Sequence, residues 1–318
     1  MRVLVTGGCG FIGSHIVDIL FRDYPGVKVL NVDKITYAAD EANVQSRHNA
    51  NYVLAKVDIC DKKALEQVWS AFDPEYVIHA AAESHVDRAN DSAQIFIDSN
   101  ITGTLNLLEL ARTHGKSLIN FHYVSTDEVY GERHLYPFRE NDELNPRNAY
   151  AASKASAEHL VEAYTETHGL TTSVTRGCNT YGPRQYREKF IPTVIGSILM
   201  GTSIPVYGNG EQEREWMYVE DHARAILNIA LSKDQLWRSW AFNVGPGTTL
   251  KNIEMIKMIG ETMGSEPLIG YVTDRKGHDR RYGMDSTLIK DYGWEPVWAL
   301  KEGLVATVEW YRQAVDKG

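Results

Sequence analysis

A tyrosine and a lysine four positions apart, Tyr150 and Lys154, stand in a stretch of helical character. Residues at this spacing lie one turn apart on the same helix face. A lysine ammonium beside a phenol stabilises the phenolate and lowers the tyrosine pKa from about 10 toward working pH. With the hydroxyl of Ser125 nearby, this pair could remove the proton of an alcohol while a hydride leaves its carbon. The same spacing also arises by chance on helix surfaces, so its weight depends on the rest of the chain.

Two adjacent carboxyls, Asp127 and Glu128, follow Ser125 and Thr126 at the end of an apolar strand expected over 118–124. An alcohol dehydrogenase needs neither carboxyl, so they suggest a second acid–base event on the same substrate. A carboxylic acid held protonated at rest needs burial or a neighbouring carboxylate. Alternation along a strand would point the two side chains to opposite faces, so the chain must leave strand geometry here. The alternative is a solvated acidic turn.

A glycine-rich turn between a strand and a helix must position this chemistry. The apolar strand 2–5 leads into glycines at positions 7, 10 and 13, and helical spacing of apolar residues follows to residue 21. Such glycines let the backbone approach a pyrophosphate at the helix N-terminus. The next strand, 27–32, ends at Asp33, whose carboxylate would accept ribose hydroxyls and repel a 2′-phosphate. NAD is therefore favoured over NADP, although Lys34 weakens this preference slightly.

Strands and helices continue to alternate, which predicts an α/β fold with a Rossmann-type, doubly wound parallel sheet covered by helices on both faces. Further strands are predicted at 52–57, 76–79 and 171–176, and helices at 61–69, 101–114 and 150–167. We expect an NAD-binding domain over 1–176, to which 218–246 returns, and a smaller α/β lobe over 177–318. A ligand would bind in the crevice between them.

Composition limits the partners and the compartment. The chain has 43% hydrophobic and 24% charged residues and a net charge of −9, which argues against nucleic acid or an anionic membrane as partner. No apolar run approaches the roughly 20 residues of a membrane span, and no leader segment is expected, so the cytoplasm is the default. Three scattered cysteines and histidines without ligand spacing predict neither disulfides nor a metal site.

Seven motifs support a more specific assignment. They are 5–14, 33–37, 81–88, 125–131, 150–155, 214–224 and 274–282. Through them the chain resembles the extended short-chain dehydrogenase/reductases that act on nucleotide sugars, and within these the 4,6-dehydratases, dTDP-glucose 4,6-dehydratase most closely. The resemblance covers nearly the whole chain. The glycine turn and the Tyr150–Lys154 pair mark only the superfamily, whereas Asp127 after Thr126 is specific, because related epimerases and decarboxylases usually carry another residue there.

The resemblance implies a lyase that holds NAD tightly. Tyr150 would take the C4 hydroxyl proton of a glucosyl ring as NAD takes the hydride. Glu128 would remove the acidified C5 proton, Asp127 would protonate the leaving C6 hydroxyl, and the hydride would return to C6. The substrate would be dTDP-glucose, with UDP-glucose possible. The alternatives are a nucleotide-sugar 4-epimerase, a UDP-glucuronate decarboxylase-like enzyme and, more remotely, a non-enzymatic NAD-sensing module.

The residues and the resemblance together give a set of expected site residues. The catalytic set is Ser125, Thr126, Asp127, Glu128, Tyr150 and Lys154. The cofactor-binding set is Gly7, Gly10, Phe11, Ile12, Gly13, Asp33, Lys34, Thr36, Asp58, Ile59, Ala80, Ala82, Asn100, Tyr150 and Lys154. The substrate-binding set is Ser84, Thr126, Asn179, Glu188, Lys189, Arg214, Asn243, Arg275 and His278.

Some positions depart from the family's usual residues, namely Cys178, Thr180 and 184–187, and they leave the nucleotide and the hexose open. The resemblance also implies a homodimer in which helices 101–114 and 150–167 form a four-helix bundle. Alanines on the second helix and leucines on the first agree with such a contact. We therefore expect a homodimer; the alternative is a monomer that buries these faces internally.

Overall fold

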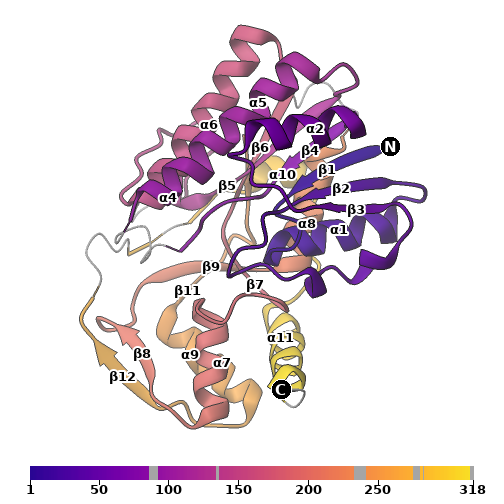
Figure 1. Cartoon of the computed structure of the whole chain (residues 1–318). Helices are drawn as coiled ribbons and strands as arrows, with labels where there is room; N and C mark the ends of the chain where they lie inside the picture. The colour runs from indigo at the N-terminus through magenta and orange to yellow at the C-terminus, as the bar shows by residue number, and fades with distance from the viewer. Residues whose placement is uncertain (86–91, 134–135, 233–240, 275–279, 282, 316–318) are drawn as a thin grey trace.

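A parallel seven-stranded sheet forms the larger lobe (Figure 1). The computed structural model describes residues 1–85, 92–133, 136–232, 241–274, 280–281 and 283–315. The strands are β1 (Arg2–Thr6), β2 (Lys28–Val32), β3 (Tyr52–Ala55), β4 (Tyr76–His79), β5 (Asn120–Thr126), β6 (Thr172–Gly177) and β10 (Ala241–Val244), in the order β10-β6-β5-β4-β1-β2-β3. The predicted Rossmann-type fold is confirmed.

Helices cover both faces of this sheet (Figure 1). α1 (Phe11–Asp23) and α8 (Val219–Ala230) pack against each other and bury one apolar cluster with β1 and β2. α2 (Lys62–Phe72), α5 (Gly103–His114) and α6 (Ala149–His168) bury a second cluster on the other face. Apolar residues at helical spacing produce these contacts, as where Leu65 and Trp69 become fully buried one turn apart.

The helix expected over 101–114 is preceded by an irregular segment. A short turn, α4 (Gln94–Phe96), runs into a π-helical turn, η3 (Ile97–Thr102), before α5 begins. The wider turn carries Asn100 inward, where its amide donates to Ser153 Oγ at 2.8 Å and bonds both backbone groups of Glu83. Periodicity does not reveal such a bulge, which is frequent near functional sites.

The smaller lobe carries two short sheets and three helices. The sheets are β11 (Thr249–Lys251)-β9 (Glu213–Tyr218)-β7 (Asn179–Tyr181) and β12 (Ile269–Val272)-β8 (Ile204–Tyr207). They pack against α7 (Phe190–Met200), α9 (Asn252–Met263) and α11 (Leu300–Val315). Thr249 lies in β11, and Lys251 is the N-cap residue of α9.

The chain crosses between the lobes more than once. After β7, α7, β8 and β9 in the smaller lobe, α8 and β10 return to the larger one, where β10 pairs in parallel with β6. α10 (Thr287–Asp291) then packs beside β10. Two 3-10 turns, η1 (Glu41–Asn43) and η2 (Gln45–His48), follow β2. Among the described residues, no helix is long and apolar enough to span a bilayer.

Candidate active site

A cleft opens at the carboxyl ends of the central strands, and both lobes line it. Parallel strands end at one edge of a sheet, so residues distant in sequence meet there. Most of the predicted site residues line this cleft. They are Gly7, Gly10, Phe11, Ile12, Gly13, Asp33, Lys34, Thr36, Ile59, Ala80, Ala82, Ser84, Ser125, Thr126, Asp127, Glu128, Tyr150, Lys154, Asn179 and Lys189.

The turn after β1 has room only for glycine. Gly7 has a φ of +71°, and a Cβ on it would lie 2.7 Å from the Cα of Ala81. A Cβ on Gly13 would lie 2.1 Å from the carbonyl oxygen of Gly7. The bare backbone therefore forms a cradle at the N-terminus of α1, where helix amides attract an anion. This cradle fits the pyrophosphate of a dinucleotide.

Asp33 is held at the end of β2 with its carboxylate toward this cradle. Its two oxygens accept hydrogen bonds from the backbone amides of Cys9 at 2.9 Å and Ile35 at 2.8 Å. Burial raises the pKa of this carboxyl, and the two amides oppose that rise. Lys34 turns toward Asp58, with 3.4 Å between Nζ and Oδ2. The lysine charge is thus partly engaged elsewhere, and the Asp33 carboxylate suits ribose hydroxyls.

A directional chain of hydrogen bonds fixes the wall formed by residues 80–82. The amide of Ala81 donates to Thr6 Oγ1 at 3.1 Å, and Thr6 lies 2.7 Å from His79 Nδ1. His79 Nε2 lies 2.9 Å from Thr104 Oγ1, which donates to the carbonyl of Asn100. Thr104 has one hydroxyl proton, so His79 must donate from Nε2 and accept at Nδ1. Burial lowers the pKa of His79 to about 3, in keeping with a neutral, structural histidine.

The tyrosine–lysine pair lies on α6 as predicted, but its electrostatics differ from the expectation. Lys154 Nζ donates to the carbonyl of Val124 at 2.7 Å and lies 4.2 Å above the ring of Tyr123. Burial lowers the pKa of Lys154 to about 7. Burial, followed by the charge of Glu128, raises the pKa of Tyr150, and a hydrogen bond from Thr126 opposes the rise. Desolvation therefore outweighs the lysine's expected effect in this structure.

The two carboxyls leave strand geometry as the sequence requires. β5 ends at Thr126, and residues 127–130 form a 3-10 turn, η4 (Asp127–Tyr130), whose Glu128 amide donates to Thr126 Oγ1. Burial, then the charges of Glu128 and Glu215, raise the pKa of Asp127 well above its usual value. Asp127 is therefore poised to hold a proton, which is the state that an acid catalyst needs.

Asn148, Glu215 and His222 are among the residues of the site that the sequence did not predict. Asn148 caps α6 through the Ala151 amide and also donates to Glu128 Oε2 at 3.2 Å, so it links the base helix to the carboxyl turn. Glu215 on β9 is buried close enough to Asp127 for its charge to act on it. His222 at the start of α8 lines the cleft below Gly177. An Asn immediately before a helix is a recognisable cap signal, whereas the other two contacts depend on tertiary packing.

Several predicted residues do not themselves line the cleft. Asn100 lies behind the wall, where it holds Glu83, and Asp58 pairs with Lys34. Asn243 is fully buried, and its amide is committed to protein groups, so the structure does not place it against a diphosphate. Arg214 donates to the carbonyls of Glu213 and Arg280, and Glu188 lies 3.8 Å from His85. Arg275 and His278 lie outside the described residues.

The positions that depart from the family's usual residues have distinct environments. Arg184 has a φ of +69°, and its guanidinium pairs with Asp18 on α1 at 2.7 Å, so it joins the lobes. Thr180 lies 2.7 Å from His222 Nδ1. Cys178 lines the cleft, and burial raises the pKa of its thiol. Of these three, Cys178 and Thr180 border the cleft, whereas Arg184 is engaged between the two lobes.

Replacement of Gly13 by Ala should weaken NAD binding, because the new Cβ would collide with the Gly7 carbonyl. Overpacking typically costs about 1–3 kcal/mol, equivalent to about 5- to 150-fold in affinity. Titration of the cofactor-free protein with NADH, followed by fluorescence, measures the change. Gly196→Ala is the matched control, since its Cβ would meet only the Met200 methyl at 4.0 Å. Unchanged affinity in Gly13→Ala would exclude this turn as the cradle.

Replacement of Asp127 by Asn should stabilise the fold more at pH 8 than at pH 5. The folded-state pKa of Asp127 is raised, so its contribution to stability is present at low pH and is lost as pH rises through that pKa. Asparagine has no proton to lose. The difference should grow by about 1.4 kcal/mol for each pH unit between the unfolded-state pKa and the folded-state pKa of Asp127, and it should stay constant above the folded-state pKa. Thermal unfolding of both proteins at several pH values tests this, and a pH-independent difference would contradict it.

Comparison with known proteins agrees with this geometry. The GDP-mannose 4,6 dehydratase family matches residues 4–307. A dTDP-glucose 4,6-dehydratase of Haemophilus influenzae is 39% identical over 98% of each chain. DesIV, a dTDP-glucose 4,6-dehydratase of Streptomyces venezuelae solved with NAD bound, superposes with a TM-score of 0.94 at 37% identity, over 100% of this chain and 98% of its own. The UDP-glucose 4-epimerase of Thermotoga maritima superposes with a TM-score of 0.90 at 34% identity, over 99% and 100%. The chain belongs to the GDP-mannose 4,6-dehydratase family.

Proposed function

We infer that this chain is an NAD-dependent hydro-lyase that converts dTDP-glucose into its 4-keto-6-deoxy sugar. One observation carries this conclusion: a buried carboxylic acid, Asp127, and a second carboxyl, Glu128, share a turn beside Tyr150. Relatives at 37–39% identity over almost the whole chain bear the dTDP-glucose 4,6-dehydratase name, and one of them was solved with NAD.

Oxidation at C4 needs a base and a hydride acceptor. NAD, when bound, accepts the C4 hydride and later returns it to C6. Tyr150 accepts the C4 hydroxyl proton, and the neighbouring Thr126 opposes the rise that burial causes in its pKa. Ser125 Oγ is buried and has no hydrogen-bond partner among the described residues, so it is available to the same substrate oxygen. Lys154 stays one helical turn away and orders the end of β5 through the Val124 carbonyl.

Elimination of water needs one base and one acid. The C4 ketone acidifies the C5 proton, and Glu128 removes it. The C6 hydroxyl leaves as water once Asp127 donates its proton, so the C5–H and C6–O bonds break as a C5–C6 double bond forms. The hydride then returns to C6 and a proton to C5, so the cycle has no net redox change. Asp127 Oδ2 is buried and has no partner among the described residues, which leaves it available to the substrate.

A 4-epimerase is the second candidate, and the fold does not exclude it, because an epimerase superposes almost as well as DesIV. Epimerisation needs the hydride shuttle and Tyr150 but no acid for a leaving hydroxide. A carboxyl buried at an energetic cost would then have no role. The raised pKa of Asp127 therefore favours dehydration.

We further propose that the substrate's diphosphate lies near residues contributed by the smaller lobe. Lys189 reaches across the cleft and donates to the Ser84 carbonyl at 2.8 Å, so it stands beside the expected sugar site. Asn179 lines the same cleft and Arg214 lies near Asp127.

We also propose that the protein works in the cytoplasm, because a reducing compartment suits the three free cysteines, Cys9, Cys60 and Cys178.

We also propose a homodimer, on revised grounds. Leu107, Leu108 and Leu110 are buried inside the chain, so these leucines do not supply the contact surface that their spacing suggested. Ile95 and Ile97, which precede α5, remain 51% and 42% exposed. α4, α5 and α6 lie on the outer face of the sheet, where a second copy could cover them (Figure 1).

Three variants should separate the steps of the reaction with dTDP-glucose. Glu128→Gln should still reduce bound NAD but stall before water loss, so NADH absorbance should accumulate in a single turnover. Asp127→Asn should exchange the C5 proton with deuterated solvent while forming little product. Tyr150→Phe should do neither. Loss of one placed acid or base costs about 10²–10⁴ in rate.

The wild-type protein is the reference in these assays, with UDP-glucose as the competing substrate. Its product should show the base-dependent absorbance of a 4-keto sugar. Formation of UDP-galactose would establish an epimerase instead. Near wild-type turnover by Glu128→Gln would show that Glu128 is not the base that removes the C5 proton.

Sedimentation equilibrium at micromolar concentration tests the dimer. The expected mass is twice the chain mass of 35.8 kDa. Ile97→Glu should shift the protein to the monomer, because a charge would be desolvated in the contact. A wild-type mass equal to one chain would contradict the proposal.

A further inference from the structure

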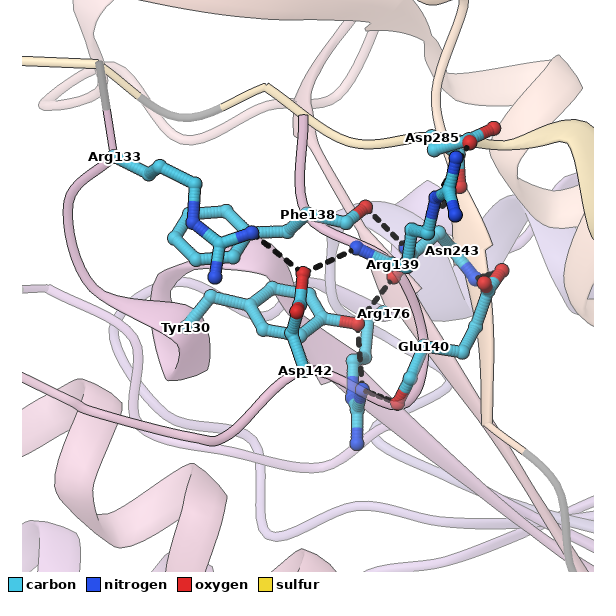
Figure 2. Close-up of polar contacts among 9 residues, drawn as sticks. All are labelled: Tyr130, Arg133, Phe138, Arg139, Glu140, Asp142, Arg176, Asn243 and Asp285. Carbon is cyan, nitrogen blue, oxygen red and sulfur yellow. Dashed lines mark hydrogen bonds and ion pairs between the residues drawn. The ribbon is translucent and has the colours of Figure 1, made fainter. Parts of the chain in front are cut away.

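The last residue of the carboxyl turn, Tyr130, has its hydroxyl deep inside the protein. It closes η4 three positions after Asp127 and is 1% exposed. The hydroxyl donates to Asn243 Oδ1 at 2.7 Å and accepts from the Arg176 guanidinium at 2.5 Å (Figure 2). The amide of Asn243 donates to the Phe138 carbonyl at 2.9 Å, which fixes its orientation and therefore the direction of the Tyr130 bond.

Arg176 connects this hydroxyl to the helix that carries the base. It forms a buried ion pair with Glu158, with Nε 2.8 Å from Oε1, and Glu158 lies one turn after Lys154 on α6. Its guanidinium also donates to the Glu140 carbonyl at 2.9 Å and lies 4.8 Å from the centre of the Tyr130 ring. Arg176 thus contacts both elements that carry the reacting groups, α6 and η4.

The same network of contacts extends to residues 283–285, which follow β12 in the chain. The rings of Tyr130 and Phe138 stack at 4.7 Å with 7° between their planes. Phe138 exchanges two backbone hydrogen bonds with that segment, to Gly283 and from Asp285, each 2.8 Å long. Met284 between them donates to Glu215, the buried carboxyl near Asp127.

A second tier of charged groups holds the loop that carries Phe138. Asp142 accepts from the Arg133 guanidinium at 2.7 Å and from the Arg139 amide at 2.8 Å. Arg133 lies over the Phe138 ring at 4.2 Å, and Arg139 pairs with Asp285 at 3.4 Å (Figure 2). These groups thus hold the loop whose Phe138 ring stacks on Tyr130.

We propose that the Tyr130 hydroxyl is a positioning group for the elimination step, which it serves by fixing the orientation of η4 relative to α6. The turn has only four residues, and the backbone bonds at its end, Gly131 to Glu128 and Asn145 to Val129, do not involve α6. Two side-chain links do: the Asn148 amide reaches Glu128 Oε2 at 3.2 Å, and Arg176 joins Tyr130 to Glu158. Hydrogen bonds to charged groups are the stronger kind, so we assign the orientation of the turn to the link through Tyr130 and Arg176. This proposal rests on the dehydratase function above.

The two chemical steps depend on this link to different degrees. Oxidation at C4 uses Tyr150 on α6 and needs no group on η4. Elimination needs Asp127 and Glu128 on η4 to meet a sugar that Tyr150 already orients. Misplacement of a catalytic group by about 1 Å can cost 10²-fold in rate. Loss of the Tyr130 hydroxyl should therefore slow water loss and spare hydride transfer.

Tyr130→Phe removes one oxygen atom and keeps the stacked ring. In a single turnover with dTDP-glucose, the rate of NADH formation should stay within about threefold of wild type, while product formation falls about 10- to 100-fold. NADH should consequently accumulate, and C5 proton exchange with deuterated solvent should slow. Tyr181→Phe is the matched control, since its equally buried hydroxyl donates to the Leu300 carbonyl at 3.1 Å in the smaller lobe.

Each outcome decides the proposal. Accumulation of NADH in Tyr130→Phe but not in Tyr181→Phe supports it. Unchanged kinetics in Tyr130→Phe, equal loss of both steps, or the same effect in Tyr181→Phe would overturn it.

Thermal unfolding and NAD titration establish that each variant is folded. If Tyr130→Phe does not fold, Arg176→Lys replaces it, because one ammonium cannot serve Glu158, Tyr130 and Glu140 together. A wild-type protein that makes no 4-keto sugar would reject the dehydratase function itself.

Discussion

The end of β5 at Thr126 is the constraint on which the site depends. A strand that continued would send Asp127 and Glu128 to opposite faces of the sheet. The 3-10 turn instead carries both to the carboxyl edge, where the end of β6 and the helix α6 also lie. The sheet supplies the edge, the flanking helices supply its rigidity, and the smaller lobe closes the space above it. Two adjacent carboxyls thus become one functional unit.

Burial then shifts the pKa values of the ionisable groups in and around that unit. The same desolvation that raises the pKa of Asp127 also lowers the pKa of Lys154 and raises that of Tyr150. Burial favours the protonated form of a carboxylic acid, which suits Asp127 as the acid. It also favours the neutral form of a phenol, which opposes the role of Tyr150 as the base. The site therefore favours its acid in the free protein, and the base depends on the charges that arrive with its ligands. Because the acid and the base lie in the same buried site, desolvation changes the pKa of both.

The sequence predicted the parts of this structure that obey a period or a local rule. Helices and strands of the larger lobe, the glycine turn and Asp33 all follow from spacing. β7 and β11 have three residues each, too few for a period to be visible. β12 has four residues, as β4 has, but it is only partly buried and lacks the continuous buried apolar run of β4. Asn243 matched a family position but is buried beneath Tyr130, because burial is a property of packing rather than of local sequence. The reversed pKa of Tyr150 has the same origin.

The ion pair between Arg184 and Asp18 bears on how long a bound cofactor stays. It joins the segment after β7 to α1, the helix whose N-terminus forms the dinucleotide cradle, and its side chains are only 8% and 17% exposed. Parting the lobes there must separate two charges that water reaches poorly, and leaving either charge unpaired costs free energy. An enzyme that regenerates NAD in every catalytic cycle does not need to exchange it with NAD from solution. We therefore expect the residence time of a bound dinucleotide to depend on this contact between the lobes as well as on the contacts to the dinucleotide itself.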